Sequence, residues 1–270
     1  MKRWSGLRAC LIGLATLAAM TGISLGGNLA DTYGPGWQSL PDWRGVWYLE
    51  GPLLFPGPGH SVIAKSGRVP KPFEYGVAPG SYFQGAPYKP EYQKLYDERL
   101  RKARARGIVE DPVDTCYIPH GMPRLMGAGP LAVEFLVTPK ETWMIWDFLN
   151  QTRRIYTDGR GHPSEDQRWP RTMGHSVGHW EDRTLVVDTV WMMEGIYDRS
   201  GAPHSDQLHL TERITRTDAK TLTADMTIED PVMFTGPWQV TRRFKKSPQK
   251  WVSVPGTYCA YEDRQPIRAE

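Results

Sequence analysis

Short segments with a strand-like pattern follow one another through the second half of the chain, and this succession most constrains the fold. In the clearest of them, 221–229, Leu222, Ala224, Met226 and Ile228 alternate with Thr, Asp and Glu. Such alternation places apolar side chains on one face of a sheet and polar side chains on the other. The segments that we predict as strands, each bounded by Pro, Gly, Asn or Asp, are 132–138, 141–148, 153–157, 174–180, 184–190, 207–217, 221–229, 238–245 and 250–261.

Most of these segments are separated by only a few residues, which favours antiparallel neighbours. Many short strands with little helix indicate a closed barrel or a strongly curled sheet, because closure removes the unpaired edges of the sheet. We therefore predict a mainly β protein whose residues 111–270 form an antiparallel β-barrel or a strongly curled sheet.

The preceding region, 31–110, has a different character. Residues 51–90 are rich in Gly and Pro, which predicts a long extended arm. One helix is predicted over about 90–106, because Pro90 suits a first helical position and Gly107 suits the end. An irregular segment as long as the arm is unusual, so a protein partner along 51–90 is one interpretation.

The first 30 residues predict export. Lys2, Arg3 and Arg8 precede an uncharged run over 9–27, as in a secretory signal peptide. A single uncleaved membrane anchor is the alternative. Both place the body of the protein outside the cytoplasmic membrane, either periplasmic or anchored facing the periplasm. The only membrane contact would be through 9–27, if that segment is not cleaved.

The charge of the body argues against nucleic acid as a partner. Without the basic residues of the leader, 30 of the 33 Lys and Arg side chains remain, against 30 Asp and Glu. A nearly neutral body attracts neither nucleic acid nor an anionic surface. Only Cys116 and Cys259 lie outside the leader. In an oxidising compartment such a pair predicts a disulfide, with two unpaired buried thiols as the alternative.

The sequence Gly174-His175-Ser176-Val177-Gly178 matches G-x-S-x-G, the nucleophile elbow of α/β-hydrolases. That motif needs a buried parallel strand before it and a helix after it. Pro170 stands shortly before the match, and a β-branched run in 184–190 follows it. We therefore interpret the match as fortuitous and do not predict Ser176 as a nucleophile.

The histidines are the stronger candidates. On a strand, His175 and His179 share one face. On 207–217, Glu212 shares a face with Leu208 and Leu210, which places a carboxylate inside the barrel. A buried charge needs a partner, and Arg242, between Val240 and Phe244, is the partner that we predict for Glu212.

Three interpretations of these polar groups stay open. The first is a structural network that fills the barrel interior. The second is acid–base catalysis by His175 or His179 with Glu212 or Asp158. The third is a metal site, for which the spacing matches no sharp motif. Its candidate ligands are His175, His179 and one of His204, His209 or Glu212.

Segments 153–160, 174–189 and 229–238 together resemble a large group of exported bacterial proteins of unassigned function. The hairpin over 178–185 also resembles the G-x-W-x-G-D-x-L hairpin of lipocalin-like barrels, although Asp182-Arg183 stands where that pattern has Gly-Asp. The first resemblance implies one Cys near the start of the body and one near its end, which fits Cys116 and Cys259. It implies no reaction and no catalytic residue.

The function that we expect is the binding or conversion of a small apolar or aromatic molecule in an internal cavity of a lipocalin-like barrel. The expected ligand-binding residues are Trp143, Tyr156, Trp180, His209 and Arg242. One alternative is an accessory subunit of a membrane-attached complex. Another is a His-dependent acid–base or metal enzyme of the lyase, isomerase or hydrolase type. The sequence names no cofactor.

Overall fold

The computed structural model describes residues 36, 39–50, 86–106, 121–127, 132–146, 150–197 and 201–248. Several predicted features lie outside these residues: the leader over 1–30, the arm over 51–85, Cys116, Cys259 and the strand over 250–261. No helix among the described residues has both the length and the apolar character needed to cross a membrane.

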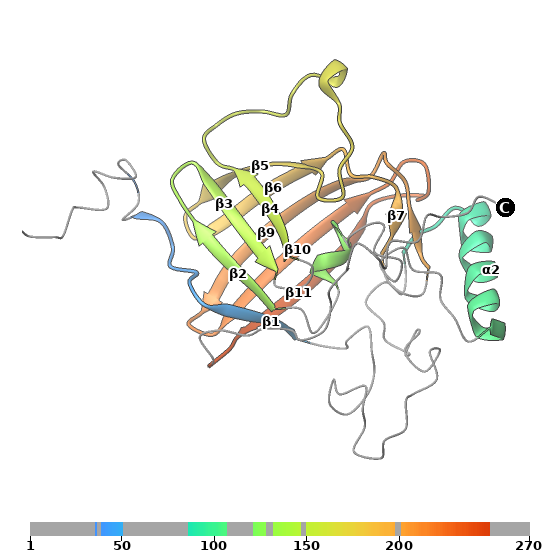
Figure 1. Ribbon diagram of the computed structural model, residues 1–270, viewed down its shortest axis with the longest axis horizontal. Helices are drawn as coiled ribbons and strands as arrows, with labels where there is room; N and C mark the ends of the chain where they lie inside the picture. The colour runs from blue at the N-terminus through green and yellow to red at the C-terminus, as the bar shows by residue number, and fades with distance from the viewer. Residues whose placement is uncertain are drawn as a thin grey trace, which may run out of the picture.

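The described strands form a closed β-barrel, which confirms the predicted fold class (Figure 1). Around the wall the strand order is β1-β11-β10-β9-β6-β5-β4-β3-β2. The barrel strands are β1 (Val46–Glu50), β2 (Ala132–Val137), β3 (Glu141–Trp146), β4 (Gln151–Tyr156), β5 (His175–Glu181), β6 (Thr184–Val190), β9 (His209–Asp218), β10 (Thr221–Glu229) and β11 (Trp238–Lys246). A small separate sheet pairs β7 (Gly195–Ile196) with β8 (Pro203–His204).

One junction of the wall departs from the antiparallel prediction. Strands β4 and β5 pair in parallel, with Ile155 opposite Ser176 and Tyr156 opposite Val177. Two parallel neighbours cannot be joined by a tight hairpin, so the chain between them, 157–174, makes a long connection. This connection, which we call the crossover loop, projects from the barrel and carries the short helix η6 (Glu165–Gln167) (Figure 1).

The interior is filled by the inward side chains of the alternating strands. Trp47, Val133, Met144, Leu185 and Ile214 are all fully buried, and they belong to one hydrophobic core cluster. This is the packing expected of a small barrel whose bore is just wide enough for its own side chains. Charged side chains interrupt the apolar interior at Arg153, Glu212 and Arg242.

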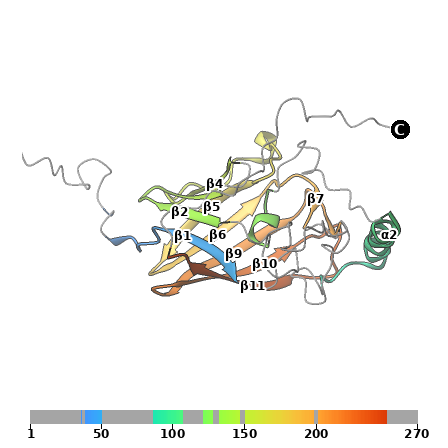
Figure 2. The ribbon, with the colours of Figure 1, turned by 60° about the horizontal axis from the view of Figure 1, so that its bottom comes forward.

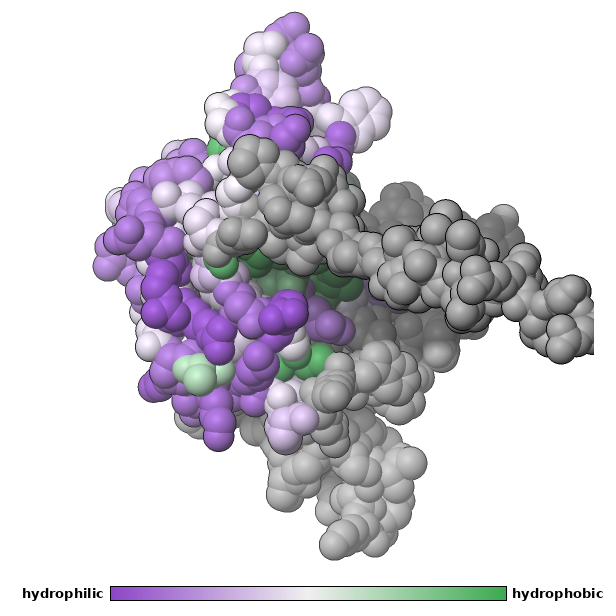
Figure 3. Space-filling model, turned by 90° about the vertical axis from the view of Figure 1, so that its left-hand side faces the viewer, coloured by the Kyte–Doolittle hydropathy of each residue, from purple (hydrophilic) through white to green (hydrophobic). Residues whose placement is uncertain are grey.

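One end of the barrel, which we call the hairpin end, consists of the turns 138–140, 182–183 and 219–220. Described side chains around this end are mostly hydrophilic (Figure 3). In the β5–β6 turn, Asp182 has φ 50°, the left-handed conformation that two-residue hairpins require. Asp tolerates this conformation better than most residues, which explains how the hairpin forms without the Gly of the lipocalin pattern.

The opposite end, which we call the capped end, is covered by the chain. The short helix η4 (Arg124–Met126) is buried there. Helix α2 (Pro90–Arg106), predicted from the sequence, lies beyond β7 in both ribbon views (Figures 1 and 2). It is tied to this end by the Tyr88 hydroxyl, which donates to the Pro203 carbonyl at 2.6 Å, and by Arg99, which donates to the Gly201 carbonyl at 3.3 Å.

Candidate functional site

The inner wall holds one polar cluster. Arg153 on β4 forms an ion pair with both carboxylate oxygens of Glu212 on β9. Its remaining donors reach the Thr189 hydroxyl at 2.7 Å and the Ser176 hydroxyl at 3.1 Å. Arg153 and Glu212 are 1% and 0% exposed. Because every partner lies inside the barrel, this cluster corresponds to the structural network of the first interpretation.

The predicted pair of Glu212 with Arg242 is wrong. Arg242 instead donates from Nε to the carbonyl of Met126 at 3.1 Å. Arg153 reaches Glu212 because the inward residues of the intervening strands β5 and β6, Ser176 and Thr189, are small at this level. Their hydroxyl oxygens accept hydrogen bonds from the guanidinium. The prediction that Glu212 points inward is confirmed.

Ser176 is a structural residue and not the nucleophile of an elbow. It lies within β5, is 1% exposed and accepts a hydrogen bond from Arg153. The two glycines of the match serve close packing instead. A Cβ at Gly174 would lie 2.6 Å from the Val190 carbonyl oxygen, and one at Gly178 would lie 2.7 Å from the Val186 carbonyl oxygen. The prediction that the match is fortuitous therefore agrees with the strand found here.

A second polar cluster lies on the outer face of the same wall, and we call it the outer histidine array. Its first link joins His175 on β5 to His162 on the crossover loop, with 2.8 Å between their Nδ1 atoms. The second joins Nε2 of His162 to Oδ2 of Asp188 on β6, 3.8 Å away. The third joins Oδ1 of Asp188 to Nε2 of His209 on β9 at 2.5 Å. Nδ1 of His209 lies 3.3 Å from Glu229 on β10.

We assign the protons of the array from the position of the Asp188 carboxylate. Nε2 of His162 has no hydrogen-bond partner among the described residues, and Asp188 is the anion nearest to it, which favours a proton on that nitrogen. Nδ1 of His162 is then an acceptor, and Nδ1–H of His175 donates to it. This leaves Nε2 of His175 unprotonated, as in a general base.

The environments separate the pKa values of these histidines. Burial lowers the pKa of His175, with the neighbouring His162 and the charges of Arg171 and Arg160 adding to the effect. Burial also lowers the pKa of His162. Conversely, the hydrogen bond that Nε2–H of His209 donates to Asp188 raises the pKa of His209. The array therefore combines histidines whose surroundings favour the neutral form at one end with a histidine whose surroundings favour the protonated form at the other.

Aromatic rings border the neutral end of the array. The Tyr156 ring stacks on His175, with 5.5 Å between ring centroids, and the Trp191 ring lies 5.8 Å from it. Trp191 has φ 60°, a conformation that costs a bulky residue about 1–3 kcal/mol and that collects at functional sites. This strained residue thus touches the outer histidine array directly.

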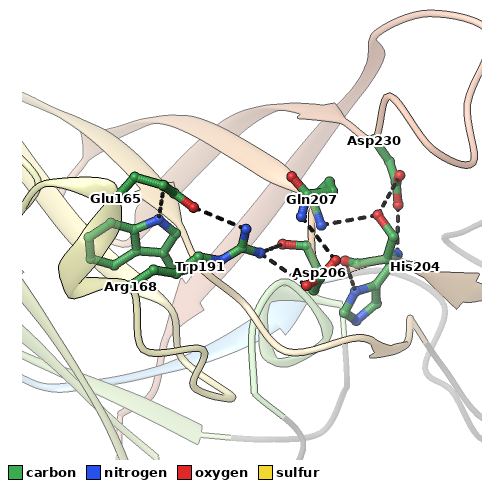
Figure 4. Close-up of polar contacts among 8 residues, drawn as sticks. Glu165, Arg168, Trp191, His204, Asp206, Gln207 and Asp230 are labelled. Atoms are coloured by element: carbon green, nitrogen blue, oxygen red, sulfur yellow. Dashed lines mark hydrogen bonds and ion pairs between the residues drawn. The ribbon is translucent and has the colours of Figure 1, made fainter.

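Hydrogen bonds tie the crossover loop to Trp191 and to Asp206 (Figure 4). The Trp191 indole N–H donates to Glu165 at 3.2 Å, and Arg168 joins Glu165 to Asp206 with contacts of 3.2 and 3.0 Å. The same network continues to the buried Asp230, which accepts from Ser205. The loop that supplies His162 is therefore fixed to the capped end.

The other predicted catalytic residues lie apart from these groups. His179 is on the face of His175, as predicted, but its side chain is 64% exposed and it contacts Glu181. Asp158 pairs with Arg160, whose hydrogen bond lowers the pKa of Asp158 to about 2, so it is a weak proton acceptor. Glu212 is on the opposite side of the wall, inside the barrel.

The predicted ligand-binding residues divide between the two faces. Trp180 and Arg242 point inward, where Trp180 packs against Trp43 with 5.1 Å between ring centroids. His209, Tyr156 and Trp143 point outward, and Arg154 stacks over Trp143 at 5.2 Å. The structure therefore brings His209 and Tyr156 to the outer array and separates them from the other members.

The metal candidates do not converge either. His204 is buried beside Tyr197 at the capped end, where burial lowers its pKa to about 4, whereas His175 and His179 are on the outer wall. Within the described ranges, no group of three or more His, Cys, Asp or Glu side chains is arranged to hold a metal ion.

Sequence reasoning missed His162 and Asp188, the residues that connect the array. The sequence does mark Asp188, because it is an acidic residue in the apolar run 184–190. On β6 it lies opposite Thr211, on the polar face of the wall. The sequence does not mark His162, because its position depends on how the crossover loop returns to the wall.

Comparisons of the chain with protein-family models, with curated proteins and with solved structures found no match. The resemblance to exported bacterial proteins therefore stays a prediction.

Proposed function

We propose that the protein converts a small molecule by acid–base catalysis on the outer wall of its barrel, with His175 as the general base. The observation that carries the proposal is the order His175–His162–Asp188–His209, in which hydrogen bonds join the first and last pairs and a 3.8 Å contact joins His162 to Asp188. In this order Nε2 of His175 keeps its lone pair at the partly exposed end of the array. Nδ1 of His175 is held by His162, and the carboxylate of Asp188 lies behind His162. A base with an orienting partner is the arrangement that general-base catalysis needs.

In this proposal Nε2 of His175 takes a proton from an O–H or an acidic C–H of the bound molecule. The imidazolium that forms already donates its Nδ1–H to His162, so the charge is stabilised without a rearrangement of the ring. The same proton returns from His175 to the product or to water. Asp188 raises the pKa of His209, which favours positive charge at the far end of the array.

The proposal moves the expected small-molecule site from the interior to the outside. The interior around Arg153 is packed with its own side chains, whereas His209 and Asp188 are 38% and 47% exposed. The Tyr156 ring that stacks on His175 also carries the guanidinium groups of Arg154 and Arg160, 4.7 and 4.2 Å from its centroid. Export remains part of the proposal and is supported by the basic start and the uncharged run over 9–27.

A direct test is the tautomer of each imidazole, measured by NMR on protein labelled with ¹⁵N at histidine. At pH 7 we expect Nδ1 of His175 and Nε2 of His162 to carry the protons, and Nε2 of His175 to be bare. A doubly protonated His175 at this pH, or a proton on its Nε2, is incompatible with the general base.

The activity test compares two histidines on the same face of the same strand. Activity should be sought with a panel of small esters, hydroxy acids and keto acids. For any compound that is turned over, His175→Gln should lower kcat by about 100-fold or more, the range of general acid–base catalysis. His179→Gln, which alters an exposed histidine outside the array, should leave kcat unchanged. Equal losses in both variants, or none, would reject His175 as the base.

A further inference from the structure

The two halves of the crossover loop are attached to the wall in different ways. The second half is tied to Trp191 by hydrogen bonds from both side chain and backbone. The first half meets the wall through His162, whose Nδ1 lies 2.8 Å from Nδ1 of His175 on β5, and only 20% of the His162 side chain is exposed. Nearby, Arg160 lies over the Tyr156 ring, but 51% of its side chain is exposed. The contact between the two imidazoles is therefore the buried attachment of the first half.

The hydrogen bond between His162 and His175 depends on how many protons the two rings hold. An N–H···N bond needs one nitrogen that donates and one that accepts. Two neutral rings meet this need, and so does a pair with one added proton, because that proton goes to an outer nitrogen. When both rings are imidazolium, each Nδ1 carries a proton and neither accepts. The second proton therefore breaks the bond, whereas the first does not.

The charges around the pair do not compensate a second proton. Asp188 is the anion nearest to His162, with 3.8 Å between Oδ2 and Nε2, but its other oxygen already accepts from His209 at 2.5 Å. The positive charges of Arg160 and Arg171 also act on the pair. The other titratable or charged groups that face these residues are Tyr156 and Arg154 on β4 and Glu229 on β10. Two imidazolium rings would thus share one carboxylate that already has a partner.

We propose that the bond between His162 and His175 is an acid-sensitive latch, which holds residues 158–163 of the crossover loop on the wall and releases them when both rings are protonated. Protonation of clustered histidines is a common trigger of such changes. Burial lowers the pKa of both rings from the usual 6.5, which favours the closed latch at and above that pH. The inference goes beyond the proposed function, because that function moves only the first proton and leaves the bond intact.

The closed latch can be observed directly in the full-length protein labelled with ¹⁵N at histidine. An N–H···N bond transmits a coupling between its two ¹⁵N nuclei. We expect this coupling between Nδ1 of His162 and Nδ1 of His175 near neutral pH. It should disappear as the pH falls below 6.5, while the amide signals of the barrel strands remain those of the folded protein. No coupling at any pH, or a pair that does not take up the second proton before the barrel unfolds, would overturn the proposal.

Release of the loop is measured separately, as the rate at which trypsin cleaves after Arg160 at pH 7.5. His162→Lys introduces a fixed charge that cannot accept from His175, and because Pro163 follows, the new lysine adds no trypsin site. His162→Gln introduces an acceptor that cannot be protonated. We expect His162→Lys to be cleaved after Arg160 about tenfold or more faster than the unaltered protein, because cleavage follows the population of the open form. His162→Gln should stay near the unaltered rate.

The matched control is His179→Lys, because His179 is on the same face of β5 but outside the array, with 64% of its side chain exposed. It should leave cleavage after Arg160 unchanged. Equal acceleration in His162→Lys and His179→Lys, or no acceleration in His162→Lys, rejects the latch and leaves the proposed function standing. A proton on Nε2 of His175 at pH 7 has the opposite consequence. It removes the general base, but the bond still has one donor and one acceptor, so the latch stands.

Discussion

The two faces of one barrel wall carry charged side chains in opposite ways. On the inner face, Arg153 and Glu212 are buried, and the donors of Arg153 are taken up by Glu212, Thr189 and Ser176. On the outer face, Asp188 and His209 remain about half exposed, and the tautomers of the array leave Nε2 of His175 without a proton. A cluster that is fully satisfied stabilises a fold, whereas a cluster with a free lone pair and access to solvent is available for chemistry.

The difference between the two faces also explains why Ser176 and Glu212, which the sequence marks as possible catalytic residues, do not belong to the candidate site. Ser176 and Glu212 stand in patterns that resemble catalytic motifs, but both point inward and bind Arg153. Their neighbours on the same strands, His175 and Thr211, point outward. A shift of one position along a strand therefore separates a structural role from a chemical one.

The largest expected effect is on the inner face. Glu212→Gln removes the charge that compensates Arg153 and should lower the free energy of unfolding by about 3–5 kcal/mol, measured by urea denaturation. The outer control Glu229→Gln should lower it by less than about 1 kcal/mol, because Glu229 and its partner His209 are 46% and 38% exposed. Similar losses in both variants would contradict the assignment of Glu212 to the structural network.

A double replacement sharpens the same result. Arg153→Met with Glu212→Leu removes both charges, and buried pairs replaced by apolar residues of similar volume are often neutral or stabilising. We therefore expect the double variant to recover most of the stability that Glu212→Gln loses. The Ser176 and Thr189 hydroxyls can still bond to each other at 3.0 Å.

The next effect concerns a histidine that is buried rather than exposed. Because burial lowers the pKa of His204 to about 4, the unfolded chain binds a proton before the folded protein does. The stability contribution of neutral His204 is therefore fully present above pH 6.5 and is lost as the pH falls toward 4. Between pH 7 and pH 4 this amounts to about 3 kcal/mol.

Urea denaturation across that pH range checks the contribution of His204. His204→Gln should be less stable at pH 7, because packing is lost, but its stability should fall less steeply below pH 6.5 than that of the unaltered protein. Parallel pH profiles for the two proteins would show that His204 titrates normally and that burial is not the controlling factor.

A smaller effect isolates the strain at Trp191. Its φ of 60° favours glycine over any residue with a Cβ by about 1–2 kcal/mol. Trp191→Gly should therefore unfold at higher urea concentration than Trp191→Ala, although both lose the indole. At Trp180, within the regular strand β5, the order should be reversed. The same order at both positions would rule out strain at Trp191.

The smallest effect is the pH dependence of the outer array. Because Asp188 raises the pKa of His209, the contribution of His209 to stability is present below pH 6.5 and is lost as the pH rises through its folded pKa. With 38% of the side chain exposed, solvent screening limits it to less than about 1 kcal/mol. Measured by urea denaturation, His209→Gln should lower the free energy of unfolding more at pH 6 than at pH 9, and equal losses at the two pH values would contradict the effect of Asp188.

The sequence predicted the barrel wall well. Alternation of apolar and polar residues located β2 to β6 and β9 to β11 to within about two residues, but not the short strands β7 and β8. It also placed Glu212 on the inner face and His209 on the outer one. Helix α2 followed from Pro90, Gly107 and an apolar stripe. These features depend on a few neighbouring residues, and a period of two is enough to decide which way each side chain faces.

Only the tertiary structure decided which side chains meet. Glu212 binds Arg153 rather than Arg242 because closure of the barrel brings β4 and β9 within reach across two strands with small inward residues. His162 meets His175 because the parallel β4–β5 junction sends residues 157–174 out of the wall and back. Periodicity along a strand is a local property, whereas register, closure and the path of a long loop depend on contacts between distant segments, and those contacts formed the candidate site.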